Sequence, residues 1–378
     1  MDFNFTDEQN MLRDSIAKFV AAEYDFDKRR AMLAAPDAWK KNWATFAEMG
    51  LLAAPLPEAH GGLGGGPIDV LVVMEEFGKA LVTEPYVQAI VLAGGFLKYG
   101  GSEAQQSEHI AAIASGERVF AFAYAEPKGR YNLADLTTTA KKAGAGYTLN
   151  GHKGVVIGAP QADHFIVSAR TAGGQRDAKG VSLFVVPKSA KGVTTRDYPT
   201  VDGFRASEVY FENVALGADA LIGPADEALP LIERVIDEAI AALAAEGAGC
   251  MRMMHALTLE YAKQRKQFGV PIASFQVLQH RMVDMFMATE QSVSMAYMAA
   301  LKMGESVDER AKAAAAAKVQ VGRAGRFVGQ AAVQIHGGMG VTDEMRVGHY
   351  FKRVTVIDSQ FGNVDHHLKR YGDLTIAA

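Results

Sequence analysis

Two short stretches of this chain carry side chains suited to holding a phosphate-bearing ligand. One is an Arg-x-x-Phe-Gly stretch that begins at Arg265, and the other is a Gln-Ile-x-Gly-Gly stretch that begins at Gln334. A guanidinium stays charged and presents a fork of donors to a diphosphate. Glycine lets the backbone approach a ligand closely, and an amide can both donate and accept. A surface arginine, a glycine helix cap and packed amides would give the same letters, so the context must decide.

Size and composition indicate a folded protein of more than one domain. The chain has 378 residues, 49% hydrophobic and 22% charged, with a net charge of −4. That length exceeds one ordinary core, and the charge offers no basic surface for nucleic acid. Cys250 is the single cysteine, so no internal disulfide can form and a reducing compartment is expected. Met1–Phe5 lacks the features of a signal peptide, and no stretch reaches the roughly 20 apolar residues of a membrane span. We therefore expect a cytoplasmic protein.

The hydrophobic period changes twice along the chain and predicts three domains. Residues 1–115 have a helical pattern, residues 116–225 contain short strand-like runs, and residues 226–378 return to a helical pattern. Asn150-Gly151 between two runs predicts a hairpin. The strand-like runs are 119–124, 147–149, 153–156, 164–169, 181–186, 192–197 and 208–211.

This order predicts a mostly α, α+β fold with segregated domains. The seven short runs, separated by turn residues, favour an antiparallel β domain built as a barrel or a sandwich. Long helices are expected over 226–265, 273–303 and 307–335, and a last helix after Gly362. We therefore predict an N-terminal helical domain, a middle antiparallel β domain and a C-terminal four-helix bundle.

The order of motifs resembles the acyl-CoA dehydrogenase family over nearly the whole chain. The similarity rests on the two stretches above and on four others, which are Phe5–Gln9, Pro57–Gly64, Arg205–Val214 and Phe275–Gln279. In that family FAD lies between the β domain of one subunit and the helical bundle of a neighbour. The resemblance implies that this chain contributes to an FAD site shared across a subunit interface. The residues that it implies at the ADP half are Arg265, Phe268, Gln276, Gln334, Gly337 and Gly338.

The catalytic base of the family has no counterpart here. The α-proton of the acyl-CoA thioester needs a base, usually a Glu placed immediately before a Gly. That position holds Phe361, followed by Gly362, and phenylalanine cannot take a proton. Some members place the Glu on the first long helix of the bundle, where this chain has Ile240. The carboxylates that could act as a displaced base are Glu246, Asp358 and Asp365.

The positions that hold the flavin ring in the family are also changed. The Thr-Glu-Pro-x-x-Gly-Ser loop appears as Ala125–Tyr131, with Ala125 for the threonine and Tyr131 for the serine. The Trp-Ile-Thr segment appears as Val155-Val156-Ile157. The hydrogen-bonding side chains expected around the isoalloxazine are therefore missing.

These differences suggest a chain that serves another subunit's site. In detail it resembles the small subunit of a two-component member of the family. The resemblance then implies a catalytic large-subunit partner, an acyl-CoA substrate, electron transfer to an electron-transferring flavoprotein, and a heterotetramer or other oligomer. Two alternatives stay open: a complete homomeric enzyme with a displaced carboxylate, and a non-enzymatic acyl-CoA-binding scaffold.

Asp365-His366-His367 could suggest a metal site. Adjacent histidines point about 100° apart around a helix, which is poor for joint ligation. No second His/Cys cluster with ligand spacing is present in the sequence. We therefore expect no metal.

Overall fold

The computed structural model describes residues 5–35 and 37–376. Met1–Asn4, which carry most of the expectation about a signal peptide, lie outside the described residues. The chain divides into two compact units, each built from separate segments. Unit 1 comprises Met1–Pro36, Pro67–Val82 and Ile240–Ala378, and unit 2 comprises Asp37–Gly66 and Thr83–Ala239.

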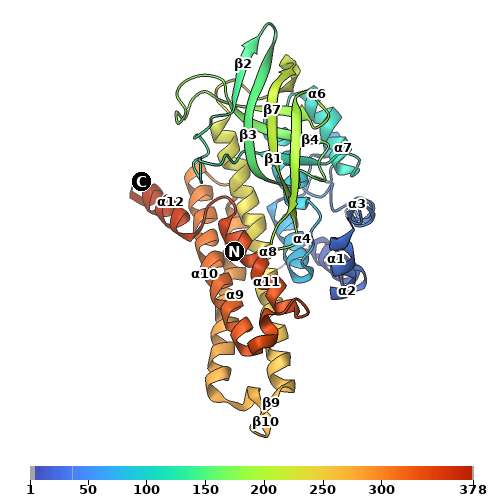
Figure 1. The fold of residues 1–378 in the computed structure, drawn as a ribbon, viewed down its shortest axis with the longest axis vertical. Coiled ribbons are helices and arrows are strands. Elements are labelled where there is room, and N and C mark those ends of the chain that lie inside the picture. Colours follow the sequence, from blue (N-terminus) through green and yellow to red (C-terminus); the bar gives the residue numbers. More distant parts are fainter. Residues whose placement is uncertain (1–4, 36, 377–378) are drawn as a thin grey trace. The chain divides into compact units, whose positions relative to one another are not determined.

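Unit 1 is helical. In Figure 1 its long helices run alongside one another, with a two-stranded hairpin at the end where α8 stops and α9 begins. α8 starts in unit 2 and continues into unit 1. The elements are α1 (Asp7–Glu23), α2 (Phe26–Ala34), α4 (Pro67–Ala80), α8 (Leu229–Gln264), β9 (Lys266–Gln267), β10 (Val270–Pro271), η5 (Ile272–Ser274), α9 (Gln276–Lys302), α10 (Val307–His336), η6 (Gly337–Val341), α11 (Arg346–Ser359) and α12 (Val364–Ile376).

Unit 2 combines short helices with a sheet. Its helices are α3 (Trp39–Glu48), η1 (Glu58–His60), η2 (Val87–Ala93), α5 (Gly94–Gly100), α6 (Glu103–Gln105), η3 (Gln106–Ile110), α7 (Ala111–Ala114) and η4 (Ala218–Ala220). Its strands are β1 (Phe120–Ala123), β2 (Thr139–Ala143), β3 (Gly146–Ile157), β4 (His164–Arg170), β5 (Val181–Pro187), β6 (Val193–Pro199), β7 (Arg205–Leu216) and β8 (Leu221–Ile222).

The eight strands of unit 2 form one sheet in the order β6-β7-β3-β2-β4-β5-β8, with β1 beside β4. The pairing is antiparallel except between β1 and β4 and at one β2–β4 contact. An apolar cluster from β1, β3, β4, β5 and β7, which includes Phe165, Phe184 and Phe211, forms the core. The predicted fold class, with helices before and after a middle β domain, is confirmed.

The hairpin predicted at Asn150-Gly151 is wrong, because β3 runs straight through both residues. The register against β7 shifts between Leu149 and Gly151, which marks a bulge. A Cβ on Gly151 would lie 2.6 Å from the Cα of Thr138. Glycine is therefore needed here because the backbone of Thr138 comes too close for a side chain. The actual turn lies between β2 and β3.

The three long helices predicted in the C-terminal half are present, with ends that differ by up to a few residues. α11 was not predicted. Its buried side chains Val347, Tyr350, Val354 and Ile357 follow helical spacing, which is the signal that could have identified it. No helix within the described residues combines the length and the apolar character that crossing a bilayer requires.

Candidate functional site

The Arg265 stretch forms the hairpin that joins α8 to α9. Gln267 pairs with Val270 around Phe268 and Gly269, whose φ angles are 53° and 83°. Two positive φ values in succession are those of a tight two-residue turn. Phe268 is 93% exposed, although a bulky side chain is rarely held in the left-handed region. Arg265 is exposed as well and forms no ion pair within the part of the chain that is described.

The Gln334 stretch ends α10, and the two glycines after the helix have free space around their backbone. Gly337 has φ 62° and ψ −143°, a conformation that is essentially restricted to glycine. A Cβ added to Gly337 or Gly338 would meet no heavy atom within 4 Å. Gln334 is exposed on the last turn of the helix. The backbone of this segment can therefore be approached closely from outside.

Tyr261 links the two stretches. Its ring stacks on that of His336 with centroids 4.3 Å apart, and its hydroxyl donates to the His336 carbonyl at 3.4 Å. Tyr261 lies one helical turn before Arg265, whose backbone N–H donates to the Tyr261 carbonyl at 2.8 Å. His336 directly precedes Gly337. The ends of α8 and α10 are therefore held together.

Gln276 lies at the same end of the bundle. It is the first residue of α9, is exposed, and follows Phe275, which gives the helix no side-chain cap. Phe275 packs edge-on against Phe268 with centroids 6.2 Å apart. The six residues implied by the resemblance thus gather at one end of unit 1. One guanidinium, two amides and open glycine backbone are a donor set that fits the ADP half of FAD.

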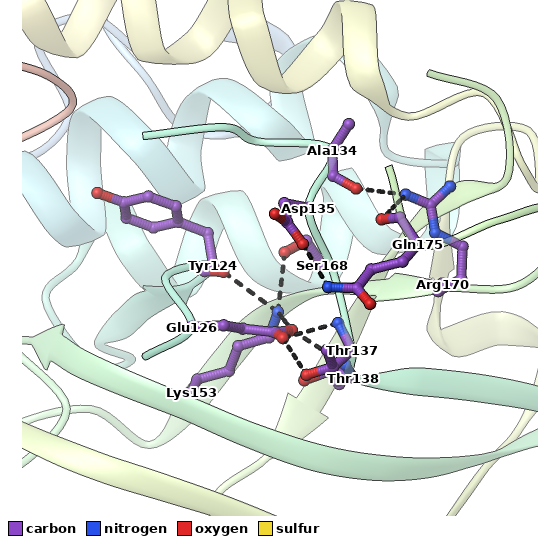
Figure 2. A network of polar contacts seen from close by, with 10 residues as sticks. All are labelled: Tyr124, Glu126, Ala134, Asp135, Thr137, Thr138, Lys153, Ser168, Arg170 and Gln175. Carbon is purple, nitrogen blue, oxygen red and sulfur yellow. Dashed lines mark hydrogen bonds and ion pairs between the residues drawn. The ribbon is translucent and has the colours of Figure 1, made fainter. Parts of the chain in front are cut away.

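A buried ion pair organises the β domain (Figure 2). Lys153 Nζ donates to Glu126 Oε1 at 2.8 Å, to the Tyr124 carbonyl at 3.2 Å and to Ser168 Oγ at 3.3 Å. Glu126 also accepts the backbone N–H of Thr137 at 2.7 Å. The Lys153 and Glu126 side chains are 0% and 3% exposed. This network fixes the loop that contains Ala125.

Electrostatics keep this pair charged. Burial alone would raise the pKa of Glu126, but the charge and hydrogen bonds of Lys153, with those of Thr137, lower it to about 2. Burial lowers the pKa of Lys153 to about 8, and Glu126 opposes that shift. Sequence reasoning missed this pair because its two members lie far apart in the chain.

Arg170 forms a second buried hub beside the first (Figure 2). It donates to the carbonyls of Ala134, Gln175 and Lys179, the last at 2.8 Å. Gln175 donates in turn to Asp135 at 2.6 Å. These bonds satisfy loop carbonyls that would otherwise be buried without donors, so the hub is structural.

Val155 projects from a bulge in β3. Lys153 pairs with Val209 and Val156 with Ser207, so Gly154 and Val155 together oppose one residue of β7. Val155 has φ 51° and is 55% exposed. A β-branched residue in this conformation is strained, and such strain concentrates at ligand sites. Its side chain can contact a flavin ring but cannot hydrogen-bond to it, so the isoalloxazine half of the site fits poorly.

Phe361 lies in a tightly held turn after α11. Its φ is 55°, and its carbonyl accepts from His367 Nε2 at 3.0 Å. The fully buried Lys318 of α10 donates to the carbonyls of Asp358 at 2.9 Å and of Gly362 at 2.6 Å. The turn is thus fixed by two buried side chains, although the residue it presents has no proton acceptor. Lys318 was missed, because nothing in the sequence separates it from Lys312 of the same alanine-rich helical segment.

The buried Lys318 should make stability depend on alkaline pH. Burial lowers the pKa of Lys318 from 10.5 to about 7. The unfolded chain then binds more protons than the folded chain between these values, so the free energy of unfolding should rise with pH from about 7 to 10.5. Neutral lysine still has two N–H groups for its two carbonyls. Lys153, whose pKa is also lowered, remains in both proteins, so denaturant titrations across this range should show a steeper rise in the wild type than in Lys318→Met. Equal slopes would contradict the prediction.

The three carboxylates proposed as displaced bases have different environments. Glu246 is gripped by Arg353, with Oε1 2.5 Å from Nε and Oε2 2.7 Å from Nη2, and both side chains are buried. Asp358 lies 3.4 Å from exposed Arg326, and its second oxygen, Oδ1, has no hydrogen-bond partner. Asp365 is exposed in the first turn of α12. The geometry of Glu246 is that of a structural ion pair.

His366 and His367 do not converge on a common point. Their rings are nearly perpendicular, with centroids 5.0 Å apart, and His367 Nε2 is engaged with the Phe361 carbonyl. No group of three or more His, Cys, Asp or Glu side chains that could hold a metal ion occurs among the described residues.

Three family models match successive parts of the chain. They are the N-terminal, middle and C-terminal domains of acyl-CoA dehydrogenase, matched over residues 6–117, 121–214 and 229–370. The chain belongs to the acyl-CoA dehydrogenase family of FAD-dependent oxidoreductases.

Relatives and solved structures agree with this assignment. The probable acyl-CoA dehydrogenase YngJ of Bacillus subtilis is 31% identical over 362 residues, covering 92% of each chain. A chain in the structure of the ChsE4-ChsE5 complex from Mycobacterium tuberculosis superposes with a TM-score of 0.90 at 26% identity, covering all of both chains. A chain in the structure of the electron transferring flavoprotein of Acidaminococcus fermentans gives a TM-score of 0.93 at 26% identity, also over the full lengths.

Proposed function

We propose that this chain is the non-catalytic small subunit of a heteromeric acyl-CoA dehydrogenase, similar to that of pimeloyl-CoA dehydrogenase. Its bundle end supplies Arg265, Gln334 and the glycines after it to the ADP half of an FAD held by a catalytic partner. The partner supplies the flavin-ring contacts and the glutamate base. The FAD so held would supply the hydride acceptor for desaturation of an acyl-CoA between the α and β carbons, and an electron-transferring flavoprotein would take the electrons onward.

The exposure of the residues proposed to bind the diphosphate carries this proposal. Phe268 lies at the hairpin tip and Arg265 is exposed at its base, while Gly337 and Gly338 present bare backbone at the same end of unit 1. A strained, exposed phenylalanine in a well-packed protein is best explained by a surface that another chain covers. The role of this chain is then to bind and orient the cofactor's phosphates.

The residues at this chain's own flavin-contacting positions support the same division of roles between this chain and its partner. Ala125 and Val155 have no hydrogen-bonding group on their side chains, and Phe361 has none to take a proton. The one fallback carboxylate on α8, Glu246, is committed to Arg353. The similarity to a chain of the two-component ChsE4-ChsE5 complex is consistent with a heteromeric assembly.

Replacing Arg265 in the assembled heteromer tests the proposal. Arg265→Ala should weaken FAD binding about 10- to 100-fold, because a hydrogen-bonded ionic contact to phosphate contributes about 1.5–3 kcal/mol. Arg265→Lys should recover only part, since it keeps the charge but loses the fork of donors. The measurement is the FAD content of the purified assembly during stepwise dilution.

Lys302→Ala, at the other end of α9, is the matched control and should leave FAD content unchanged. A complete homomeric enzyme would instead bind FAD without a partner. A non-enzymatic scaffold would show no FAD in any assembly. An assembly whose FAD content is unaffected by Arg265→Ala would overturn the proposed role.

A further inference from the structure

Unit 1 contains a cavity that none of the residues above explains. It has a volume of about 420 Å³ and lies between α1 and α2 on one side and the end of α4, α8 and α11 on the other. This volume lies within the range typical of small-molecule sites, roughly 300–1,000 Å³. It is separate from Arg265 and the glycine segment, whose residues do not line it.

Most of the cavity wall is apolar or aromatic. Tyr24 and Phe26 come from the start of α2 and the residues before it, Leu81 from the end of α4, Met253 from α8 and Tyr350 from α11. The hydroxyl of Tyr350 is already used, because it donates to the carbonyl of Lys79. These walls favour a ligand with an aliphatic or aromatic body.

Two of the four charged residues at the cavity are engaged elsewhere. Lys79 Nζ lies 2.6 Å from Glu76 Oε1 and 3.4 Å from a second carboxylate. Asp25 caps α2, with its Oδ1 accepting the backbone N–H groups of Asp27 and Lys28. Neither residue is therefore available to anchor a ligand.

The two arginines give the cavity its charge. Arg29 is buried and donates from Nε to the Leu81 carbonyl at 2.9 Å, which fixes its position in the wall. Arg346 is exposed, lies 5.6 Å from the centre of the Phe26 ring, and forms no ion pair within the described ranges. Burial raises the pKa of Tyr350, and Arg346 and Arg29 both oppose that rise, so both guanidiniums lie within electrostatic reach of its phenol.

We propose that this cavity binds a small organic carboxylate, with Arg346 pairing with the carboxylate and the Phe26, Leu81, Met253 and Tyr350 side chains enclosing an apolar body. The exposed guanidinium of Arg346 suits a carboxylate, which it can bind through two parallel hydrogen bonds. This inference does not depend on the proposed role in FAD binding.

The test uses hexanoate and its neutral analogue hexanamide, each titrated into the purified chain by calorimetry or ligand-detected NMR. Hexanoate should saturate below about 10 mM, the range expected of a weak single-anchor site. Hexanamide should bind at least about tenfold more weakly, and Arg346→Ala should weaken hexanoate by a similar factor. Ala21→Trp at the exposed rim should block binding by filling the space.

Arg30→Ala is the matched control. Arg30 also lies over the Phe26 ring, at 5.9 Å, but does not line the cavity. It should leave hexanoate affinity unchanged, as should Arg265→Ala, which separates this test from that of FAD binding. Equal affinity for acid and amide, no saturation by hexanoate, or unchanged binding in a folded Arg346→Ala would each overturn the inference.

Discussion

Replacing Arg353 by alanine should lower the free energy of unfolding by about 3–5 kcal/mol, because it leaves the buried Glu246 carboxylate without its cation. The two side chains are 2% and 3% exposed and form a two-point contact that joins α11 to α8. A charge in such a position cannot recover water. Urea titration followed by circular dichroism should show the loss as a lower midpoint.

Two control variants show whether the loss of stability in Arg353→Ala comes from the unpaired Glu246 carboxylate. Glu246→Leu combined with Arg353→Met removes both charges and should recover most of the stability. Arg326→Ala breaks an ion pair in which the arginine is 66% exposed, and it should cost at most about 1 kcal/mol. If Arg353→Ala lowers the free energy of unfolding no more than Arg326→Ala does, Glu246 is not committed to this ion pair. It would then again be a candidate for the displaced catalytic base.

The second large effect should come from Lys153. Lys153→Met is expected to destabilise the β domain by about 3–5 kcal/mol, again by isolating a buried carboxylate, here Glu126. The double variant Glu126→Gln with Lys153→Met should be much less affected. If it is as unstable as Lys153→Met alone, packing and the bonds to Tyr124 and Ser168 matter more than charge.

The same pair predicts how the protein responds to acid. The pKa of Glu126 falls from 4.5 to about 2 on folding, so its contribution to stability is present above pH 4.5 and is lost as the pH falls toward 2. Without Lys153, burial would raise this pKa above 4.5, so folded Lys153→Met would take up a proton before its unfolded chain does, and its stability deficit should shrink as the pH falls. Identical acid unfolding curves for the two proteins, scaled to their starting stability, would contradict this.

Sequence reasoning succeeded where a pattern is local. Helical spacing predicted the long helices of the bundle, whose ends lie within a few residues of the predicted ones. It failed at Asn150-Gly151, because the requirement for glycine arises from Thr138, which lies just before β2 and is distant in sequence. Local turn chemistry cannot report such a contact.

The candidate site likewise has one part that could be predicted from local sequence and one part that could not. The motifs that begin at Arg265 and Gln334 were visible because they are contiguous in sequence. The side chains that support their neighbours were not. Tyr261 and His336, which join the two motifs, and Lys318, which holds the turn at Phe361, are defined by contacts between helices. These contacts become visible only once the helices are packed.

The central claim is that this chain binds FAD phosphates for a partner and has no working centre of its own. The most direct measurement is the FAD content and acyl-CoA oxidation of the purified chain, alone and co-purified with an acyl-CoA dehydrogenase homologue that carries the catalytic Glu. The account predicts negligible FAD and no turnover for the chain alone, and stoichiometric FAD with turnover for the pair. One FAD per chain and acyl-CoA oxidation by the chain alone would contradict it.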